Sequence, residues 1–232
     1  MRAAWKAITM LAVAAMIGAP SAARADEDGK AKYAERLTES TQAFQELTSS
    51  SDHKVPEKLM RNAKCVVVIP GMVKGALGFG ARLGNGVMSC RDSRGSWSAP
   101  VFVDLKGGSW GLQIGAQKTD LVLFFMTEKG ARSLVNKSKF TLGGSASIAA
   151  GPMGRSGEAD TDLHLNAEIY SYAKSKGLFA GISLEGANLK ISDKANGIYW
   201  GAKVSPRGIL FASKEPQMPP EARDFVAVLP RY

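Results

Sequence analysis

LGGSASIAAGPMGRSGEADTDLHLNAEIYSYAKSKGLFAGISLEG, at residues 142–186, is the stretch that decides the predicted fold. Apolar and polar side chains alternate from Glu158 to Ile169, as expected for a strand with one buried face. A second alternating run follows the turn at residues 174–177 and begins at Leu178. The two runs predict an antiparallel hairpin with lysines at its tip, and a glycine-proline loop joins it to a third, preceding strand.

Glycine pairs suggest where the chain turns upstream of this stretch. GALGFGARLGNG, at residues 75–86, predicts two glycine-bent strands around a turn at Asn85 and Gly86, where a positive φ is tolerated. Gly107 and Gly108 predict the turn of another hairpin. The remaining strands are predicted from alternating or continuous apolar patterns at residues 66–69, 97–105, 110–114, 121–126, 198–203 and 209–212.

Helices are predicted at both ends of the chain. In residues 30–49 a helical period of 3.6 places Tyr33, Leu37, Phe44 and Leu47 on one face, with Ser40 in the gap. Pro219-Pro220 opens a last helix, and shorter helices open at Pro56 and after Thr127. The pattern predicts an α+β fold: a mainly antiparallel, strongly curved or partly closed β-sheet with N- and C-terminal helices.

The first 25 residues are predicted to be a signal peptide. Arg2 and Lys6 precede an apolar run at residues 7–19, about 13 residues against the roughly 20 that span a bilayer. Small residues at 23–25 suit cleavage before Asp26, and no cysteine follows the cut to carry a lipid. We therefore expect a periplasmic or secreted protein, with a helix and linker at residues 26–54 and one domain at residues 55–232.

Positive charge is concentrated downstream of the first helix. The formal charge is +9 for the whole chain, whereas residues 26–49 contain six acids and three bases. One candidate patch follows a helical spacing of four, three and three residues: Lys54, Lys58, Arg61 and Lys64. A second combines a glycine-flanked arginine with the hairpin tip: Arg155, Lys174 and Lys176. Each patch suits phosphate groups, but a solvated surface or an ordinary turn would look the same.

Other chemistry finds little support in the residue pattern. No GxSxG motif is present, and Gly78, Gly80 and Gly84 form GxGxxxG where a dinucleotide-binding loop needs GxGxxG. His164 shares the polar side of one predicted strand with Asp160 and Asp162, where all three can face water. We expect no catalytic activity, cofactor or metal. We also expect no nucleic acid as a partner, because the protein is predicted to be exported and lacks an aromatic stacking platform.

Two cysteines, Cys65 and Cys90, end predicted strands that residues 71–86 connect. They could form a disulfide in an exported protein, or remain two buried thiols.

A family resemblance is carried by five segments: VVVIPGMVKGALGFGARLGNG, WSAPVFVDLKGGSWGLQIGAQKTDLVLFFM, LGG, AAGPMGR and YSYAKSKGLFAGISLEG. With these segments, residues 55–204 resemble the SYLF domain family. The resemblance implies membrane lipid binding, best described for phosphoinositides in eukaryotes, an actin-binding role in yeast, and no established catalysis. The eukaryotic relatives are thought to use an N-terminal amphipathic helix on membranes. In this sequence the N-terminal helix is acidic, so an anionic bilayer would repel it. The other interpretation of this helix is that it packs on the domain through Leu37 and Phe44.

The sequence therefore leads to the hypothesis of non-catalytic binding of anionic phospholipid at the bacterial cell envelope. The alternative is an envelope interaction or scaffolding protein that binds another protein and has no lipid specificity. Actin is not expected as a partner of a periplasmic protein. Uptake of an acyl chain into an internal apolar pocket is a further form of lipid binding that the sequence leaves open.

Overall fold

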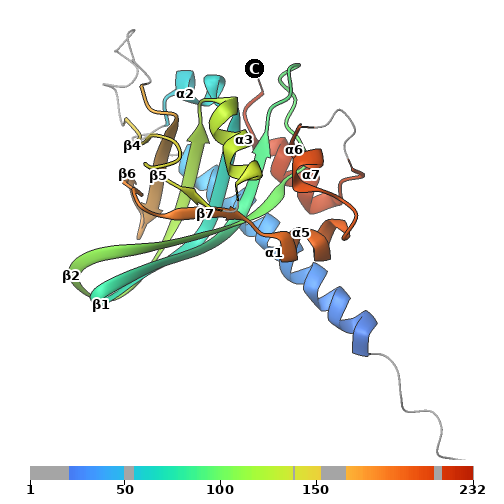
Figure 1. Cartoon of the computed structure of the whole chain (residues 1–232), viewed down its shortest axis with the longest axis horizontal. Coiled ribbons are helices and arrows are strands. Elements are labelled where there is room, and N and C mark those ends of the chain that lie inside the picture. Colours follow the sequence, from blue (N-terminus) through green and yellow to red (C-terminus); the bar gives the residue numbers. More distant parts are fainter. Residues whose placement is uncertain (1–20, 50–54, 138, 153–165, 212–215, 232) are drawn as a thin grey trace, which may run out of the picture.

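Two long strands that double back on themselves dominate the computed structural model, which describes residues 21–49, 55–137, 139–152, 166–211 and 216–231. Strands β1 (Cys65–Cys90) and β2 (Val101–Phe125) pair antiparallel from Cys65 opposite Phe125 to Met88 opposite Val101. A disulfide joins the two ends of β1, whose Cα atoms are 4.0 Å apart. Figure 1 shows both strands turning back together at the far end of the pair.

Glycine permits this bend without ending either strand. The predicted turn at Asn85 and Gly86 is wrong, because both residues lie within β1, opposite Asp104 and Val103. A Cβ atom on Gly86 would lie 2.0 Å from the carbonyl oxygen of Val68, so this glycine allows the two halves of β1 to approach each other. The predicted hairpin turn at Gly107-Gly108 is also wrong, since β2 continues through both glycines.

The sheet is mainly antiparallel and strongly curved, as predicted, with helices at both ends of the chain. Only the β4–β5 pair is parallel among the strands that the structure describes. In order across the sheet lie β3 (Phe140–Thr141), β7 (Asn188–Ile191), β2, β5 (Ile169–Ser175) and β4 (Ile148–Ala150), with β1 also paired to β2 and β6 (Leu178–Gly181) to β5.

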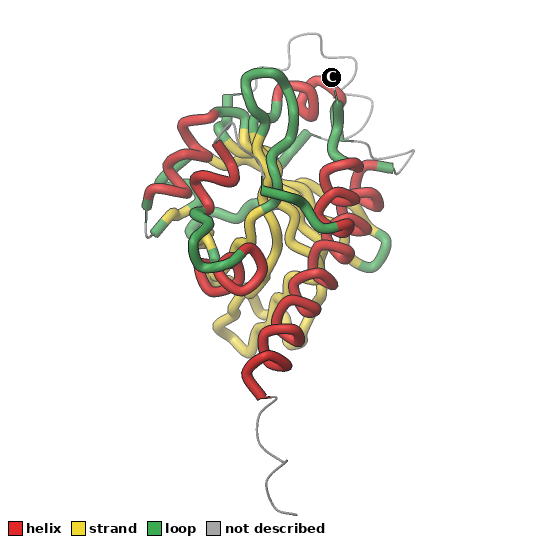
Figure 2. Tube along the Cα trace, turned by 90° about the vertical axis from the view of Figure 1, so that its right-hand side faces the viewer, coloured by secondary structure: helices red, strands yellow, loops and turns green. Residues whose placement is uncertain are grey.

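Helices cover both faces of this sheet, and each face has its own apolar core. The outer core contains side chains of α1 (Ser21–Thr48), α2 (Glu57–Asn62), α5 (Asp193–Trp200) and α7 (Pro220–Val228). The inner core contains side chains of α3 (Glu128–Asn136) and α6 (Pro206–Phe211). Figure 2 shows α1 running along one side of the strands. Helices α1 and α7 pack against each other, so the N-terminal and C-terminal helices share one core.

The helix predicted at residues 30–49 is confirmed with the expected buried face. Leu37, Phe44 and Leu47 are fully or almost fully buried, and the hydroxyl of Ser40 in the gap donates to the carbonyl of Arg36 (2.7 Å). The predicted helix after Thr127 is also confirmed, because its hydroxyl accepts the amide of Gly130 (3.1 Å) as a helix cap. The interpretation that α1 packs on the domain is the one that this burial supports.

The strands predicted at residues 198–203 and 209–212 are wrong, because α5 and α6 occupy this region. Asn196, predicted in a turn, is buried within α5 and bonds the backbone at the start of β2. Its Oδ1 accepts the amide of Phe102 (2.9 Å), and its Nδ2 donates to the carbonyl of Phe102 (3.0 Å). One side chain thus satisfies both backbone groups of Phe102 as a neighbouring strand would.

The predicted hairpin exists, but its first strand lies later in the chain than expected. Strand β5 begins at Ile169, where the predicted strand was to end, and residues 158–165 lie outside the described residues. It turns into β6 through Lys176 and Gly177, whose φ angles are +50° and +80°. Gly151, at the start of the glycine-proline loop, is closely packed, because a Cβ atom on it would lie 2.0 Å from the ring of Tyr172. Burial raises the pKa of that phenol, which donates to the carbonyl of Pro152 (2.9 Å).

Loss of the disulfide should destabilise the protein strongly. Cys65 and Cys90 are 25 residues apart and both are buried. The disulfide restricts the unfolded chain and thereby raises the free energy of unfolding by about 3 kcal/mol. The double variant Cys65→Ala/Cys90→Ala should lose this free energy of unfolding in urea denaturation. Reductant should lower the stability of the wild type and leave the double variant unchanged; equal stability of oxidised and reduced wild type would contradict the prediction.

Asn196→Ala should lower the free energy of unfolding by roughly 1–3 kcal/mol, because it leaves the buried amide of Phe102 without its partner, whereas the carbonyl of Phe102 still accepts the amide of Ser192 (2.9 Å). Asn62→Ala is the matched control, since Asn62 is exposed on α2 and should change stability by less than about 0.5 kcal/mol. Urea denaturation followed by circular dichroism compares the two. Similar losses in both variants would show that Asn196 has no special role.

Candidate functional site

The first predicted patch lies beside the disulfide. Lys58 and Arg61 are exposed on α2, and Arg61 forms an ion pair with Glu57 (2.5 Å). Lys64 follows the helix, and its backbone amide donates to the carbonyl of Phe125 (2.7 Å), at the end of β2. Lys54 lies outside the described residues. The row predicted from helical spacing is therefore located at the Phe125 end of the sheet.

The second predicted patch lies at the opposite end of the same strands. Phe125 pairs with Ile169 at one end of β5, whereas Lys174 pairs with Asp120 near the other end, just before Lys176 in the turn. At about 3.3 Å per residue, the length of β5 separates the two patches by roughly 20 Å. Arg155 lies outside the described residues. The structure does not join the two patches into one surface.

The bend of β1 and β2 adds residues to this second patch that the sequence did not identify. Val73 lies opposite Lys118, and Lys74 lies opposite Gln117. The hydroxyl of Ser175 donates to the carbonyl of Lys118 (2.9 Å) and accepts from the side-chain amide of Gln117 (2.7 Å), which holds the hairpin against β2. We call this edge of the sheet the cationic end. It comprises Val73, Lys118 and Lys174 on the face toward α1, Lys74 and Leu178 on the other face, and Lys176 in the turn.

Apolar side chains are exposed at the cationic end. Leu178 is 77% exposed and Val73 is 39% exposed, and Leu83, at 53%, lies on the same long strand as Val73. These three are the large hydrophobic side chains that are exposed in the described part of the chain. Figure 1 shows the β5–β6 hairpin on the same side of the molecule as the bend of β1 and β2. Cations beside exposed apolar side chains are the combination that an interfacial contact needs.

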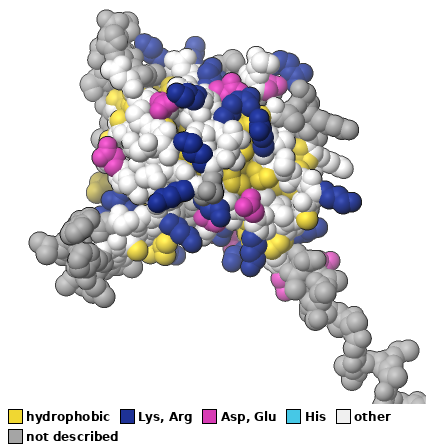
Figure 3. Space-filling model, viewed as in Figure 1, with side chains coloured by type: hydrophobic (Ala, Val, Ile, Leu, Met, Phe, Trp, Pro, Cys, Tyr) yellow, Lys and Arg dark blue, Asp and Glu magenta, His cyan; other side chains and the backbone are white. Residues whose placement is uncertain are grey.

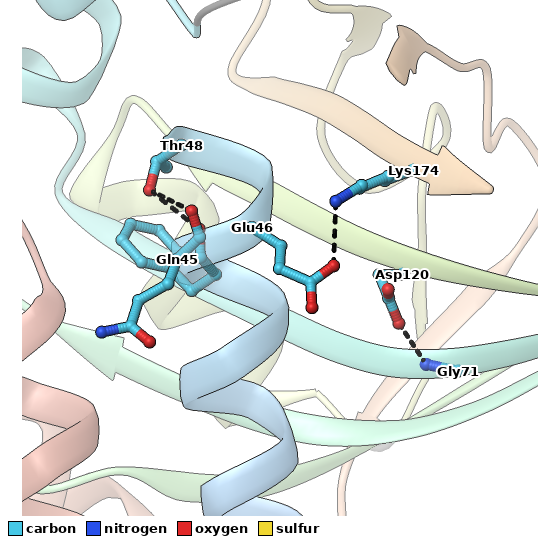
Figure 4. Close-up of polar contacts among 7 residues, drawn as sticks. Gln45, Glu46, Thr48, Gly71, Asp120 and Lys174 are labelled. Atoms are coloured by element: carbon cyan, nitrogen blue, oxygen red, sulfur yellow. Dashed lines mark hydrogen bonds and ion pairs between the residues drawn. The ribbon is translucent and has the colours of Figure 1, made fainter. Parts of the chain in front are cut away.

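Acidic residues lie close to this surface on α1 and β2. Figure 4 shows Lys174 directed at Glu46 of α1, with an Nζ–Oε2 distance of 2.9 Å. In the same view, Asp120 Oδ1 accepts the backbone amide of Gly71 (2.8 Å). Lys174 is thus partly neutralised by its neighbour, whereas Lys118 and Lys176 are exposed and have no carboxylate partner among the described residues.

Basic side chains also gather elsewhere on the surface. Figure 3 shows lysines and arginines spread over the face that carries β7 and α3. Lys190 and Lys106 are exposed on the adjacent strands β7 and β2, where Lys190 lies opposite Asp104 and Lys106 lies opposite Asn188. Among the described residues, Leu83 is the exposed large apolar residue paired with this region, opposite Lys106. The cationic end has two such residues, Val73 and Leu178.

Other candidate chemistry receives no support from the described residues. No group of three or more His, Cys, Asp or Glu side chains that could hold a metal ion occurs among them, and His53, His164, Asp160 and Asp162 lie outside this set. Gly78, Gly80 and Gly84 lie within β1 and form no loop. Within the same part of the chain, no helix has the length and apolar character needed to cross a bilayer.

Comparison with known proteins supports the resemblance noted in the sequence. The family model described as "Ysc84: Las17-binding protein actin regulator" matches residues 106–232. "Protein YSC84" of Saccharomyces cerevisiae is 32% identical over 212 residues, which cover 90% of this chain and 44% of that protein. "SH3 domain-containing YSC84-like protein 1" of Xenopus laevis is 34% identical over 182 residues, covering 78% of this chain and 53% of that protein.

A third relative, "LAS seventeen-binding protein 3" of Saccharomyces cerevisiae, is 34% identical over 181 residues, which cover 77% of this chain and 39% of the relative. The chain thus spans about half or less of the length of these relatives. The similarity extends over most of this chain, from the strands of the curved sheet to the last helix of the domain. The chain belongs to the Ysc84/SYLF family.

Proposed function

We propose that this protein binds anionic membrane lipid through the cationic end, without catalysis, at a bacterial cell envelope after export. The observation that carries the proposal is the exposure of Leu178, at 77%, directly beside Lys176 and within the hairpin that Ser175 holds against Lys118. A leucine entering the interfacial region loses contact with water, and each nearby lysine adds about 1 kcal/mol at an anionic surface.

The patch around α2 is less suited to this role. Its apolar residue Leu59 is buried, and the charge of Arg61 is shared with Glu57 (2.5 Å). No exposed large apolar residue of the described chain lies on α2. Residues of this patch therefore provide a control surface with the same kind of charge at the other end of β5.

Helix α1 is also disfavoured as the lipid contact. Its apolar side chains Leu37, Phe44 and Leu47 are already buried against the sheet, so membrane insertion would require them to leave the core. Its exposed residues include Glu35 and Glu39, which an anionic bilayer repels. An internal acyl pocket is disfavoured for a similar reason, because the side chains on the inner face of the sheet are buried against one another.

The alternative function is binding of another protein. The family description names Las17 binding and actin regulation, which are properties stated for other members of the family. A protein partner would be supported by specific co-purification together with equal binding to neutral and anionic vesicles. The vesicle measurements below therefore separate the two functions.

Charge reversal at the cationic end should abolish most membrane binding. Lys118→Glu/Lys176→Glu should weaken binding to anionic vesicles at least about 25-fold, because each lysine contributes about 1 kcal/mol. Lys58→Glu/Lys64→Glu makes the same change in net charge at the distant patch and should retain most of the binding. Flotation measures both, and added salt should weaken wild-type binding. Equal losses in the two variants would indicate attraction by net charge alone and contradict the assignment of the surface.

Lys176→Asn should separate stability from membrane binding. Asparagine-glycine is favoured in a two-residue hairpin turn, whereas lysine at a φ of +50° is strained, so the free energy of unfolding should rise by about 0.5–1 kcal/mol. Binding to anionic vesicles should fall by about fivefold with the lost charge. Lys137→Asn, at an exposed position after α3, should leave binding unchanged. Binding by Lys176→Asn equal to that of the wild type would remove Lys176 from the proposed surface.

A further inference from the structure

A cavity opens beside the cationic end, between α1 and the bend of the sheet. It has a volume of about 330 Å³, at the lower end of the range for small-ligand sites. Helix α1 contributes Glu39, Gln42, Ala43 and Glu46 to its lining, and β1 and β2 contribute Pro70, Gly71, Lys118 and Asp120. Most of the lining residues are exposed or half-buried, so the cavity is open to solvent. Figure 4 shows two of them, Glu46 on α1 and Asp120 on β2.

The charges that line this cavity are mainly negative. Three carboxylates, on Glu39, Glu46 and Asp120, face one lysine, Lys118. Glu46 is paired with Lys174 (2.9 Å), and Asp120 accepts the amide of Gly71 (2.8 Å). Glu39 forms no hydrogen bond or ion pair with the other residues that the structure describes. A cationic group entering the cavity would find a carboxylate ready to accept its hydrogen bonds, whereas a multiply charged anion would be repelled.

Lys118 belongs both to this cavity and to the cationic end. Its backbone carbonyl accepts the hydroxyl of Ser175, which places the Lys176 turn next to it. Phosphate is therefore favoured at the rim and an ammonium group is favoured inside. A headgroup that carries a phosphodiester and a primary amine has both charges in one small molecule. A primary ammonium donates three hydrogen bonds to carboxylates, whereas a quaternary ammonium donates none.

We propose that this cavity binds the primary ammonium of a phosphoethanolamine headgroup at Glu39, with the phosphate of the same lipid at Lys118. The inference rests on the proposed membrane function and deepens it by naming a headgroup class. Attraction by the cationic end would bring the protein to an anionic surface, and the cavity would then select zwitterionic lipids that carry an amine. Gln42 can donate to the phosphate or accept from the ammonium.

The soluble headgroups test the cavity directly. Glycerophosphoethanolamine and glycerophosphocholine are titrated separately into the full chain, with chemical shifts of backbone amides as the readout. The wild type should bind the ethanolamine compound up to about fivefold more tightly than the choline compound. Glu39→Gln should remove this difference. Glu35→Gln is the matched control, because Glu35 is exposed on α1 and does not line the cavity. Equal binding of the two compounds by the wild type, or retention of the difference in Glu39→Gln, overturns the proposal.

Vesicles then distinguish this proposal from the proposed function. Vesicles with a fixed fraction of phosphatidylglycerol contain either phosphatidylethanolamine or phosphatidylcholine as the remaining lipid. Stronger wild-type binding to the ethanolamine vesicles, lost in Glu39→Gln and kept in Glu35→Gln, supports a lipid as the source of the headgroup. Dependence on phosphatidylglycerol without any ethanolamine preference overturns the cavity assignment and leaves the proposed function intact. An ethanolamine preference without dependence on phosphatidylglycerol supports the cavity and overturns the anionic-lipid function.

Discussion

The contact between the two halves of β1 is the constraint on which the rest of the structure depends. Gly86 can approach the backbone of Val68 because it has no side chain, and the disulfide between Cys65 and Cys90 closes the same strand at its ends. Since β2 pairs with β1 along most of its length, with two register shifts, both strands bend together. The doubled pair then offers two faces to the helices, so alternate residues such as Val67 and Val68 enter different cores.

The same bend creates the candidate site. It places Val73 and Lys74 of β1 beside Lys118 of β2, and the hydroxyl of Ser175 holds the β5–β6 turn against them. Helix α1 packs over the outer core and forms the opposite wall of the cavity that Lys118 lines. The full set of cations and the acidic cavity are therefore products of tertiary packing, because each combines residues of separate segments.

The sequence predicted those features that depend on neighbouring residues. Apolar periodicity identified α1 with its buried Leu37, Phe44 and Leu47, and capping chemistry identified the helix after Thr127. The prediction from sequence failed where one residue type is compatible with two different local structures. Gly86 permits a turn or a close approach, and Asn196 can form a turn or bond a buried backbone. Lys174 and Lys176 were found because they lie at a turn, but Val73 and Lys118 are paired only through strand register, which no local pattern contains.

Helix α1 extends beyond the sheet that it covers (Figure 1). Glu46 contacts Lys174 at the cationic end, whereas Asp28 lies 18 residues earlier, about 27 Å along the helix axis, and is exposed. Figure 1 shows this early part of α1 extending away from the rest of the fold. Glu27 and Asp28 are followed there by the exposed Lys30 and Lys32, so the charges of this protruding end nearly cancel. A charged surface would therefore exert little net force on the free end of α1.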